Sequence, residues 1–316
     1  MNRSLTLAVT SLAALLLAVG VAVAAQPTVK GAKNCRVFPA DNAWNQRVDA
    51  LPVAGDSRDL IDSIGEHASA HADFGSGKWE GAPIGIPYVV VSSKTKKRKV
   101  SFEYADESDR IRYPIPKNVP IEGGRRSSGD RHVIAIDRSK CKLYELYAAY
   151  PKSGGKSWKA GSGAVWSLKS NKLRPAGWTS ADAAGLPIFP GLARYDEVAR
   201  GAIDHALRFT APRTRRAYVY PARHQAGGSD DPDLPPMGAR VRLKPSVDIG
   251  SFPKQSRVIL TALRRYGAIL ADNGSAWYFS GAPDSHWDND DLHSLGRLTG
   301  SDFEVVDTSS LPTPGR

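Results

Sequence analysis

Two ionisable side chains interrupt an otherwise apolar pair of predicted strands in GDRHVIAIDRSKCKLYELY, residues 129–147. They are His132 and Glu145. A carboxyl group on a sheet face among aromatic side chains readily acquires a raised pKa, which suits a general acid, and an imidazole can act as a base. The alternative is that both are structural polar groups, with Glu145 paired to one of the many arginines. We treat them as the first catalytic candidates.

The register of this hairpin decides whether the two side chains can act together. A shift of one residue moves a side chain to the other face of a sheet. In one register His132, Ile134, Glu145 and Tyr147 share a face, and in the other His132 and Glu145 point in opposite directions. The sequence leaves both registers open.

A second group of candidates lies in residues 178–210. Asp182 occupies the small, polar segment TSADAAG, which is followed by the proline-fixed GLPIFPGL. Such a segment is typical of a loop that lines a cleft. Asp204 and His205 are adjacent in a predicted strand, where His205 is either a buried structural imidazole or a functional one.

These residues suit two reactions on a polysaccharide. Glycoside hydrolysis needs two carboxyl groups across the scissile bond, and Glu145 with Asp182 or Asp204 is the expected pair. Elimination from a uronic acid is the alternative, with His132, His205 or Tyr147 as base and arginines that neutralise the substrate. The expected substrate-binding side chains are Trp178, Trp166, Tyr147, Arg131, Arg208 and His224.

A protein that binds a cell wall or glycan without catalysis is a third interpretation. It would use surface aromatics and basic patches, but it would not need polar side chains inside apolar strands. That difference favours an enzyme. Because the sequence lacks a glycine-rich phosphate loop, GxSxG and HExxH, nucleotide enzymes, α/β-hydrolases and zincins are set aside. The spacing of the histidines matches no compact zinc motif, so neither a metal nor another cofactor is expected.

The formal net charge is +11, with basic clusters at 94–99, 125–126 and 213–216. Such a charge favours an anionic partner, although it could simply be solvated. The cluster KTKKRK has no interleaved aromatic residues, so nucleic acid is not the expected partner. We expect a monomer that meets an extracellular polysaccharide, an anionic one included.

The first residues, MNRSLTLAVTSLAALLLAVGVAVAA, have the basic start, apolar run and small-residue end of a secretory signal, so 1–25 is expected to be removed. No later stretch approaches the ~20 apolar residues of a spanning helix. The mature protein is therefore expected to be secreted, and its two cysteines, Cys35 and Cys141, to form a disulfide. In the chain-entropy model, a loop of about 107 residues closed in this way contributes roughly 4–5 kcal/mol.

Many short strand-like segments, with few helices between them, must position these residues. They include PYVVVSS, RKVSFEYAD, AVWSLKS, AIDHALRFT, RAYVYPARH and ARVRLKP. The spacing of apolar residues predicts helices over 56–67, 251–272 and 288–298. This pattern predicts an all-β chain, an antiparallel sandwich or jelly roll with a few peripheral helices, as a single domain over 26–316.

Three segments, GLPIFPGLARYDEV, GAIDHALRFT and RYGAILADNGSAW, resemble a group of exported bacterial proteins. The resemblance spans most of the mature chain. No established activity is attached to that group, so the resemblance assigns no functional residue.

Overall fold

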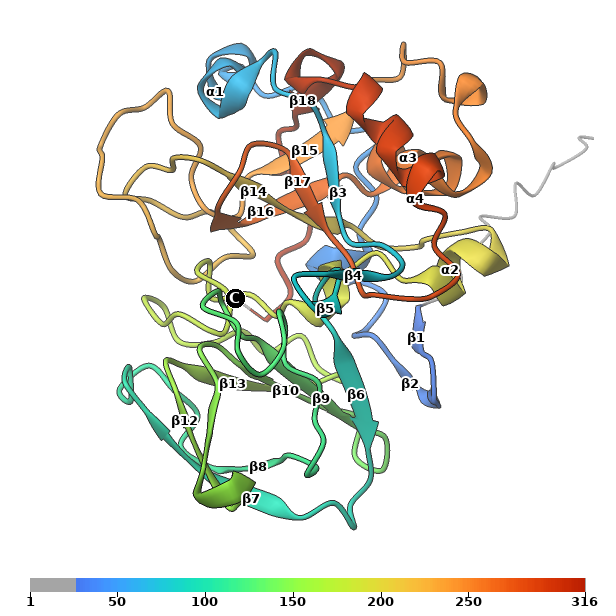
Figure 1. The fold of residues 1–316 in the computed structure, drawn as a ribbon. Coiled ribbons are helices and arrows are strands. Elements are labelled where there is room, and N and C mark those ends of the chain that lie inside the picture. Colours follow the sequence, from blue (N-terminus) through green and yellow to red (C-terminus); the bar gives the residue numbers. More distant parts are fainter. Residues whose placement is uncertain (1–26, 316) are drawn as a thin grey trace, which may run out of the picture.

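The computed structural model describes residues 27–315, and its strands form an upper and a lower body in Figure 1. The upper body is a six-stranded mixed sheet in the order β18-β15-β16-β14-β17-β3. Its strands are β3 (His71–Asp73), β14 (Leu207–Ala211), β15 (Arg240–Leu243), β16 (Ala268–Asn273), β17 (Tyr278–Ser280) and β18 (Phe303–Val305). The expected signal segment, residues 1–25, lies outside the described part of the chain.

The lower body consists of two four-stranded sheets, which we call the middle sheet and the outer sheet. The middle sheet has the order β13-β10-β9-β6, with β6 (Tyr88–Val91), β9 (Val133–Asp137), β10 (Lys142–Leu146) and β13 (Gly163–Ser167). The outer sheet has the order β11-β12-β7-β8, with β7 (Lys97–Phe102), β8 (Arg112–Pro114), β11 (Tyr150–Lys152) and β12 (Ser157–Ala160). Strands β7, β8 and β12 lie at the bottom of the molecule in Figure 1.

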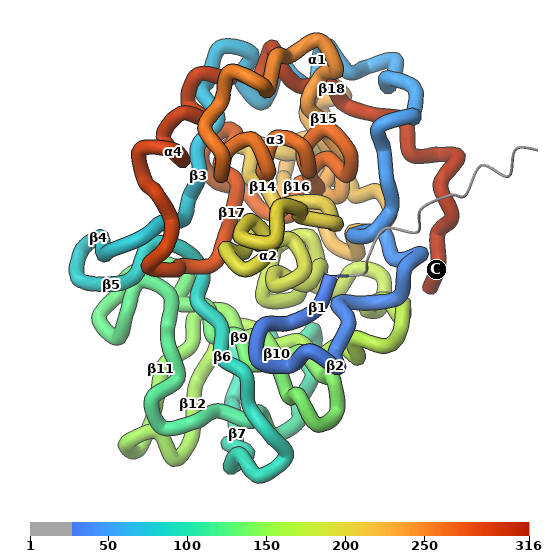
Figure 2. The backbone as a smooth tube through the Cα atoms, turned by 90° about the vertical axis from the view of Figure 1, so that its right-hand side faces the viewer, coloured from blue at the N-terminus to red at the C-terminus, as the bar shows by residue number. Residues whose placement is uncertain are grey.

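Helices are few and lie around the upper sheet, where Figure 2 shows α2 and α3 in front of its strands. They are α1 (Ser57–Gly65), α2 (Tyr195–Arg200), α3 (Lys254–Arg265) and α4 (Asn289–His293). Two short ribbons complete the strands, β1 (Thr28–Val29) with β2 (Ala32–Arg36), and β4 (Lys78–Trp79) with β5 (Ala82–Pro83).

The expectation of a strand-rich chain with a few peripheral helices is confirmed, but the sheets are not antiparallel throughout. Parallel pairs occur in each of the three larger sheets, namely β14 with β16, β3 with β17, β6 with β9, and β7 with β12. Parallel neighbours need a long connection. Between β14 and β16 the segment 212–267, which contains β15 and α3, provides it. No sheet within residues 27–315 closes into a barrel.

The middle sheet is covered on both faces, which explains the polar side chains found in it. Ile134 and Ile136 of β9 pack into the core that it shares with the upper sheet, whereas Val133 and Ala135 pack into the core that it shares with the outer sheet. Side chains alternate between the faces of a strand, so this sheet is a buried layer between two cores. Any polar group on it must find a partner inside the protein.

The hairpin adopts the register in which the polar side chains share a face. Glu145 lies opposite Ile134, and Leu146 lies opposite Val133. Continuing this register places Tyr147 opposite His132, and their ring centroids are 6.0 Å apart. His132, Ile134, Glu145 and Tyr147 therefore face the upper sheet together.

The helix predicted over 251–272 is only partly correct. Helix α3 ends at Arg265, and residues 268–273 form β16 instead. Gly267 causes the break, because it has a φ of 65° and a Cβ at this position would lie 2.1 Å from the carbonyl oxygen of Val241. Only glycine fits such a conformation without strain.

Two predicted strands also differ from the structure. The segment 202–210 becomes a strand only from Leu207, so Asp204 and His205 lie in the loop before β14. The segment 216–224 forms no strand and makes only an isolated bridge, Tyr218 to Met237. Pro221, which cannot donate a backbone hydrogen bond, interrupts this segment.

The predicted disulfide is confirmed: Cys35 of β2 is bonded to Cys141, which lies in the turn between β9 and β10. It ties the first ribbon to the middle sheet. In residues 27–315 no helix is both long and apolar enough to cross a membrane.

Replacing both cysteines, Cys35→Ala with Cys141→Ala, is expected to lower the free energy of unfolding by about 2–5 kcal/mol. The bond closes a loop with a sequence separation of 106 residues, whose freedom in the unfolded chain is otherwise large. Denaturant unfolding of the native and double-variant proteins measures the difference. A change below about 0.5 kcal/mol would contradict a stabilising role.

Candidate functional site

A row of polar side chains crosses the upper sheet at the edge that meets the middle sheet. Asp73 of β3 is paired with Ser280 of β17. The register of β17 with β14 places Arg208 opposite Ser280, and Arg208 Nη1 donates to Ser280 Oγ at 2.7 Å. Asp272 lies in β16, the strand on the other side of β14, where it is paired with Thr210 of β14. The strands thus align Asp73, Ser280 and Arg208 in one row, and Asp272 lies diagonally from Arg208.

Arg208 is the centre of a buried ion-pair cluster. Its Nε and Nη2 donate to the two carboxylate oxygens of Asp182 at 2.8 and 2.7 Å, and Nη2 also donates to Asp272 Oδ2 at 3.2 Å. The Asp182 side chain is fully buried. Burial and the neighbouring charge of Asp182 raise the pKa of Asp272 to about 7, against the opposing effect of Arg208. The cluster therefore brings together two residues from the sequence prediction, Asp182 and Arg208, with one that it missed.

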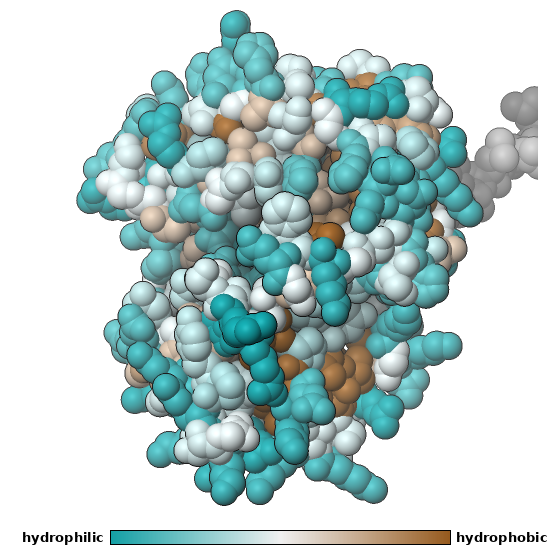
Figure 3. Space-filling view, viewed as in Figure 1, coloured by the Kyte–Doolittle hydropathy of each residue, from teal (hydrophilic) through white to brown (hydrophobic). Residues whose placement is uncertain are grey.

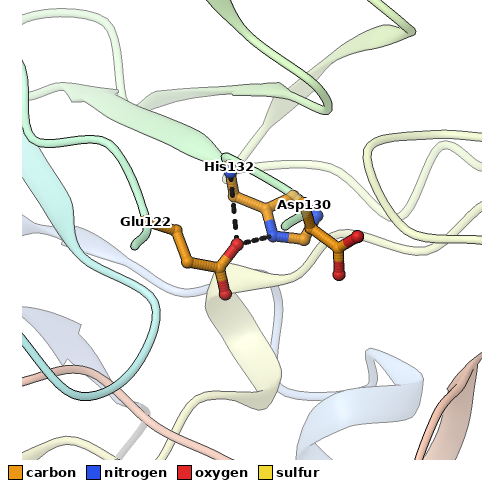
Figure 4. A group of neighbouring side chains, drawn as sticks. All are labelled: Glu122, Asp130 and His132. Atoms are coloured by element: carbon orange, nitrogen blue, oxygen red, sulfur yellow. Dashed lines mark hydrogen bonds and ion pairs between the residues drawn. The ribbon is translucent and has the colours of Figure 1, made fainter. Parts of the chain in front are cut away.

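His132 links this cluster to a carboxylate from the lower body. Its Nδ1 lies 2.6 Å from Glu122 Oε2, and its Nε2 lies 3.0 Å from the carbonyl oxygen of Ala181. Figure 4 shows the bond to Glu122. Because both partners are acceptors, both ring nitrogens must donate, so the ring is an imidazolium. Burial alone would lower the pKa of His132, but the charge and hydrogen bond of Glu122 raise it to about 9.

Glu122, Asp130 and His132 also form the one group among the described residues whose ligand atoms lie close enough for a metal, within 4.8 Å of one another. A metal-bound imidazole must offer a nitrogen lone pair. Both His132 nitrogens already donate to oxygen acceptors, and in Figure 4 the carboxylates of Glu122 and Asp130 lie on different sides of the ring. The group fits an ion pair better than a metal site.

A cavity of about 900 Å³, here called the Trp79 cavity, opens beside Glu122. Its walls include β3, the β4–β5 hairpin and the loop 122–129. Glu80 and Gly81, both with positive φ, form the two-residue turn of the hairpin. The turn presents Trp79, which is 72% exposed, at the cavity. Tyr278 and His71 add a second aromatic surface, with ring centroids 4.3 Å apart.

Three carboxyl groups line the Trp79 cavity, and the pKa values of two of them, Asp73 and Glu122, are shifted in opposite directions. Desolvation raises the pKa of Asp73, and the charge of Glu122 adds to this effect. Burial would also raise the pKa of Glu122, but His132 lowers it. Such a divergent pair suits a protonated acid beside an ionised base or nucleophile.

A second cavity of about 420 Å³, the Asp272 cavity, lies on the other side of the cluster. It is lined by Tyr147 and His224 from the sequence prediction and by the carboxylates Glu107, Asp130, Asp182 and Asp272. His224 Nδ1 lies 2.8 Å from the carbonyl oxygen of Ala183, which leaves Nε2 as the acceptor in the neutral ring. In the described part of the chain no lysine or arginine lines this cavity.

Glu145 has a structural place instead of a position in either cavity. Its side chain is fully buried, and its carboxylate accepts hydrogen bonds from the backbone N–H groups of Ile188 and Phe189 at 2.9–3.1 Å. Burial raises its pKa to about 7 in spite of these bonds. The carboxylate therefore holds the proline-fixed loop against the middle sheet, and it does not pair with Asp182 or Asp204 across an open space.

The other predicted residues lie outside both cavities. Asp204 forms a surface ion pair with Arg200 at 3.3 Å, and the buried His205 lies 3.1 Å from Glu197. Trp166 is buried and Trp178 is half-buried, with the guanidinium of Arg174 over both rings.

Arg131 is buried beneath the loop 122–129 and holds it by hydrogen bonds. It is 1% exposed and donates to the carbonyl oxygens of Gly124, Arg125 and Ser127 at 2.9–3.3 Å. These residues belong to the loop that lines the Trp79 cavity. Arg131 therefore orders that loop and does not reach a substrate.

The residues that the sequence interpretation missed are Asp73, Glu122 and Asp272. Asp73 and Glu122 belong to short segments with weak periodicity, and Asp272 was assigned to the end of a helix. The break at Gly267 was the available signal, because it separates AILADN from α3.

No family model, curated protein or solved structure matches this chain.

The charge on His132 predicts a specific pH dependence of stability. Because its pKa is raised from 6.5 to about 9, the folded state holds a proton that the unfolded state releases. The free energy of unfolding should therefore fall as pH rises from about 6.5 to about 9. His132→Gln is expected to remove the part of this pH dependence that comes from His132. Denaturant unfolding of both proteins across that pH range measures the difference.

Glu122, Asp130 and Arg208 are the charged groups that act on His132. His67→Gln, at an exposed histidine, is the matched control and should keep the native slope. Equal slopes in the native protein and His132→Gln would contradict a buried imidazolium.

Proposed function

We propose that this protein is a secreted glycoside hydrolase that cleaves an extracellular polysaccharide in the Trp79 cavity. The observation that carries the proposal is that Asp73 and Glu122, whose pKa values are shifted in opposite directions, line one large cavity with an exposed tryptophan. Asp73 is the general acid that protonates the leaving oxygen. Glu122 is the ionised carboxylate, acting as base or nucleophile. His132 is a positioning residue that keeps Glu122 ionised and in place.

The charge of the cavity supports a neutral or amino sugar as substrate. Asp73, Glu80 and Glu122 line it, against the single arginine Arg126. Elimination from a uronic acid is less well supported, because it needs cations beside the substrate carboxylate. Among its candidate bases, His132 has no free lone pair and His205 is buried beside Glu197. Tyr147 lines the Asp272 cavity, where no described lysine or arginine is present. The candidate cations, Arg131 and Arg208, are buried. Glycan binding without catalysis, the third interpretation, is tested by the cleavage assay described next.

Asp73→Asn and Glu122→Gln are each expected to lower kcat/KM by at least about 100-fold, because each removes one acid–base function. The substrate is found first by screening neutral and uronic-acid polysaccharides with the mature protein. Reducing ends and ultraviolet absorbance are followed together, since only elimination creates an unsaturated chromophore. Asp204→Asn and Glu103→Gln are matched controls at positions outside both cavities.

The pH profile provides a second test of these roles. The rate should fall on the acid side as Glu122 is protonated and on the alkaline side as Asp73 loses its proton. In His132→Gln the acid limb should move to higher pH, because the charge that lowers the Glu122 pKa is gone. A chromophore among the products, full activity of Asp73→Asn, or binding without cleavage would each overturn hydrolysis by this pair.

Trp79 is expected to bind a sugar ring by stacking, away from the bond that breaks. Trp79→Ala should raise KM by about fivefold and change kcat little, because stacking of this kind contributes about 1 kcal/mol. Steady-state kinetics on the same polysaccharide separate the two constants. Tyr104→Ala, which removes another exposed aromatic ring, is the control and should leave both constants near their native values. A fall in kcat alone would contradict a binding role for Trp79.

A further inference from the structure

The positive charge of this chain is concentrated in its lower body. Residues 88–170, which span β6 to β13, contain 18 lysine and arginine residues and eight aspartate and glutamate residues. Their net charge is +10, whereas that of the whole chain is +11. The remainder of the chain is therefore almost neutral, and the excess charge belongs to the middle and outer sheets.

Within the lower body, exposed cations gather on the solvent face of the outer sheet. Val100, Tyr113 and Trp158 point inward to the core shared with the middle sheet. Their strand neighbours point outward and are exposed, since side chains alternate along a strand. We call this surface the outer basic face; its cations are Lys97, Lys99, Arg112, Lys152 and Lys159.

Like charges lie next to each other on this face. Lys99 of β7 is directly opposite Arg112 of β8, and such a pair is destabilising. Lysines often protect edge strands, but β7 and β12 are the interior strands of this sheet. Among the described residues only Lys159 of the five faces a carboxylate, that of Glu103 at 4.0 Å. Protection of the edges therefore does not explain the pattern, and a ligand that supplies negative charge would relieve it.

We propose that the outer basic face binds an anionic polysaccharide and holds the protein on it. Neighbouring strands are about 5 Å apart and alternate side chains along a strand about 7 Å, so the cations form an open, regularly spaced array. Such an array fits an extended polymer that carries carboxylate or sulfate groups at short intervals. Hydrophilic side chains cover the bottom of the molecule in Figure 3, where β7, β8 and β12 lie.

Several observations favour a polysaccharide over a nucleic acid or a membrane. Four of the five cations are lysines, which act as hydrated point charges, whereas nucleic-acid recognition relies on arginine and stacking aromatic rings. The aromatic side chain on the face is Tyr150, and the guanidinium of Arg131 already lies 4.2 Å from its ring centroid. Membrane insertion would need a set of exposed apolar side chains among the cations, whereas Ile111, next to Arg112, is a single one.

The outer basic face is separate from the proposed active site. None of its five cations is among the described residues that line the Trp79 cavity or the Asp272 cavity. The acidic Trp79 cavity would cleave one glycan while the basic face holds another, or another region of the same matrix. Binding by this face can therefore succeed or fail independently of the hydrolase proposal.

The test compares two charge-reversed variants of the full mature chain. One carries Lys97→Glu, Lys99→Glu and Lys159→Glu, and the matched control carries Lys172→Glu, Arg213→Glu and Lys254→Glu at exposed positions elsewhere. Calorimetry with polygalacturonate should show affinity at least about tenfold weaker for the first variant and within about twofold of native for the control. Native affinity should also fall as salt rises from about 0.05 M to about 0.5 M.

Equal loss in both variants would show that binding reflects net charge alone and would overturn the proposal. So would equal affinity for polygalacturonate and neutral dextran, or tighter binding to duplex DNA that depends on the same three lysines. The corresponding Lys→Gln variant should show a smaller loss of the same kind. Far-ultraviolet circular dichroism and cleavage of the neutral substrate check that each variant is folded, and both should stay near native.

Discussion

The rest of the structure depends on the burial of the middle sheet on both faces. A sheet with one wet face can leave polar side chains in solvent, but this one lies between two cores. Each polar group on it must therefore be paired within the protein. Glu145 is paired with two backbone N–H groups of the proline-fixed loop, and His132 with Glu122 and a carbonyl oxygen. The two residues that first suggested catalysis thus support other segments of the chain.

The same requirement produces the charged cluster between the upper and lower bodies. Arg208 is buried, and Asp182 and Asp272 provide its counter-charge. Buried ion pairs often contribute little net stability because desolvation is costly, but they hold their members in defined positions. Here they hold two carboxylates, Asp182 and Asp272, in the wall of the Asp272 cavity. With Asp73 and Asp272 separated by the strands β17 and β14, about 14 Å at ordinary strand spacing, the two cavities are distinct sites.

Charge is also separated over the whole molecule. Acids predominate among the charged side chains that line the two cavities, while the excess cations lie in the lower body. A net charge of +11 therefore says little about the ligand of a cavity. It describes the surface that meets the surroundings, and the local set of side chains describes the chemistry of the cavity.

The sequence by itself determined the features that depend on neighbours along the chain or on composition. These include the disulfide between its two cysteines, the strand-rich character, the 129–147 hairpin and the short helices. It also named Asp182, Tyr147 and His224 among its larger set of site candidates, and these three line the Asp272 cavity. Here local propensity, alternation and turn residues agree with the final fold.

Only the tertiary structure decided which polar groups are available for chemistry. Glu145 and Asp73 are both carboxylates in short strands, yet one is covered by a loop and the other opens into a cavity. That difference comes from contacts between residues far apart in the chain, which periodicity does not encode. The role of His132 was decided in the same way: its partner Glu122 is ten residues away, in a segment without a regular pattern. Burial and pairing are properties of the packed sheets, so they could be known only once the sheets were placed together.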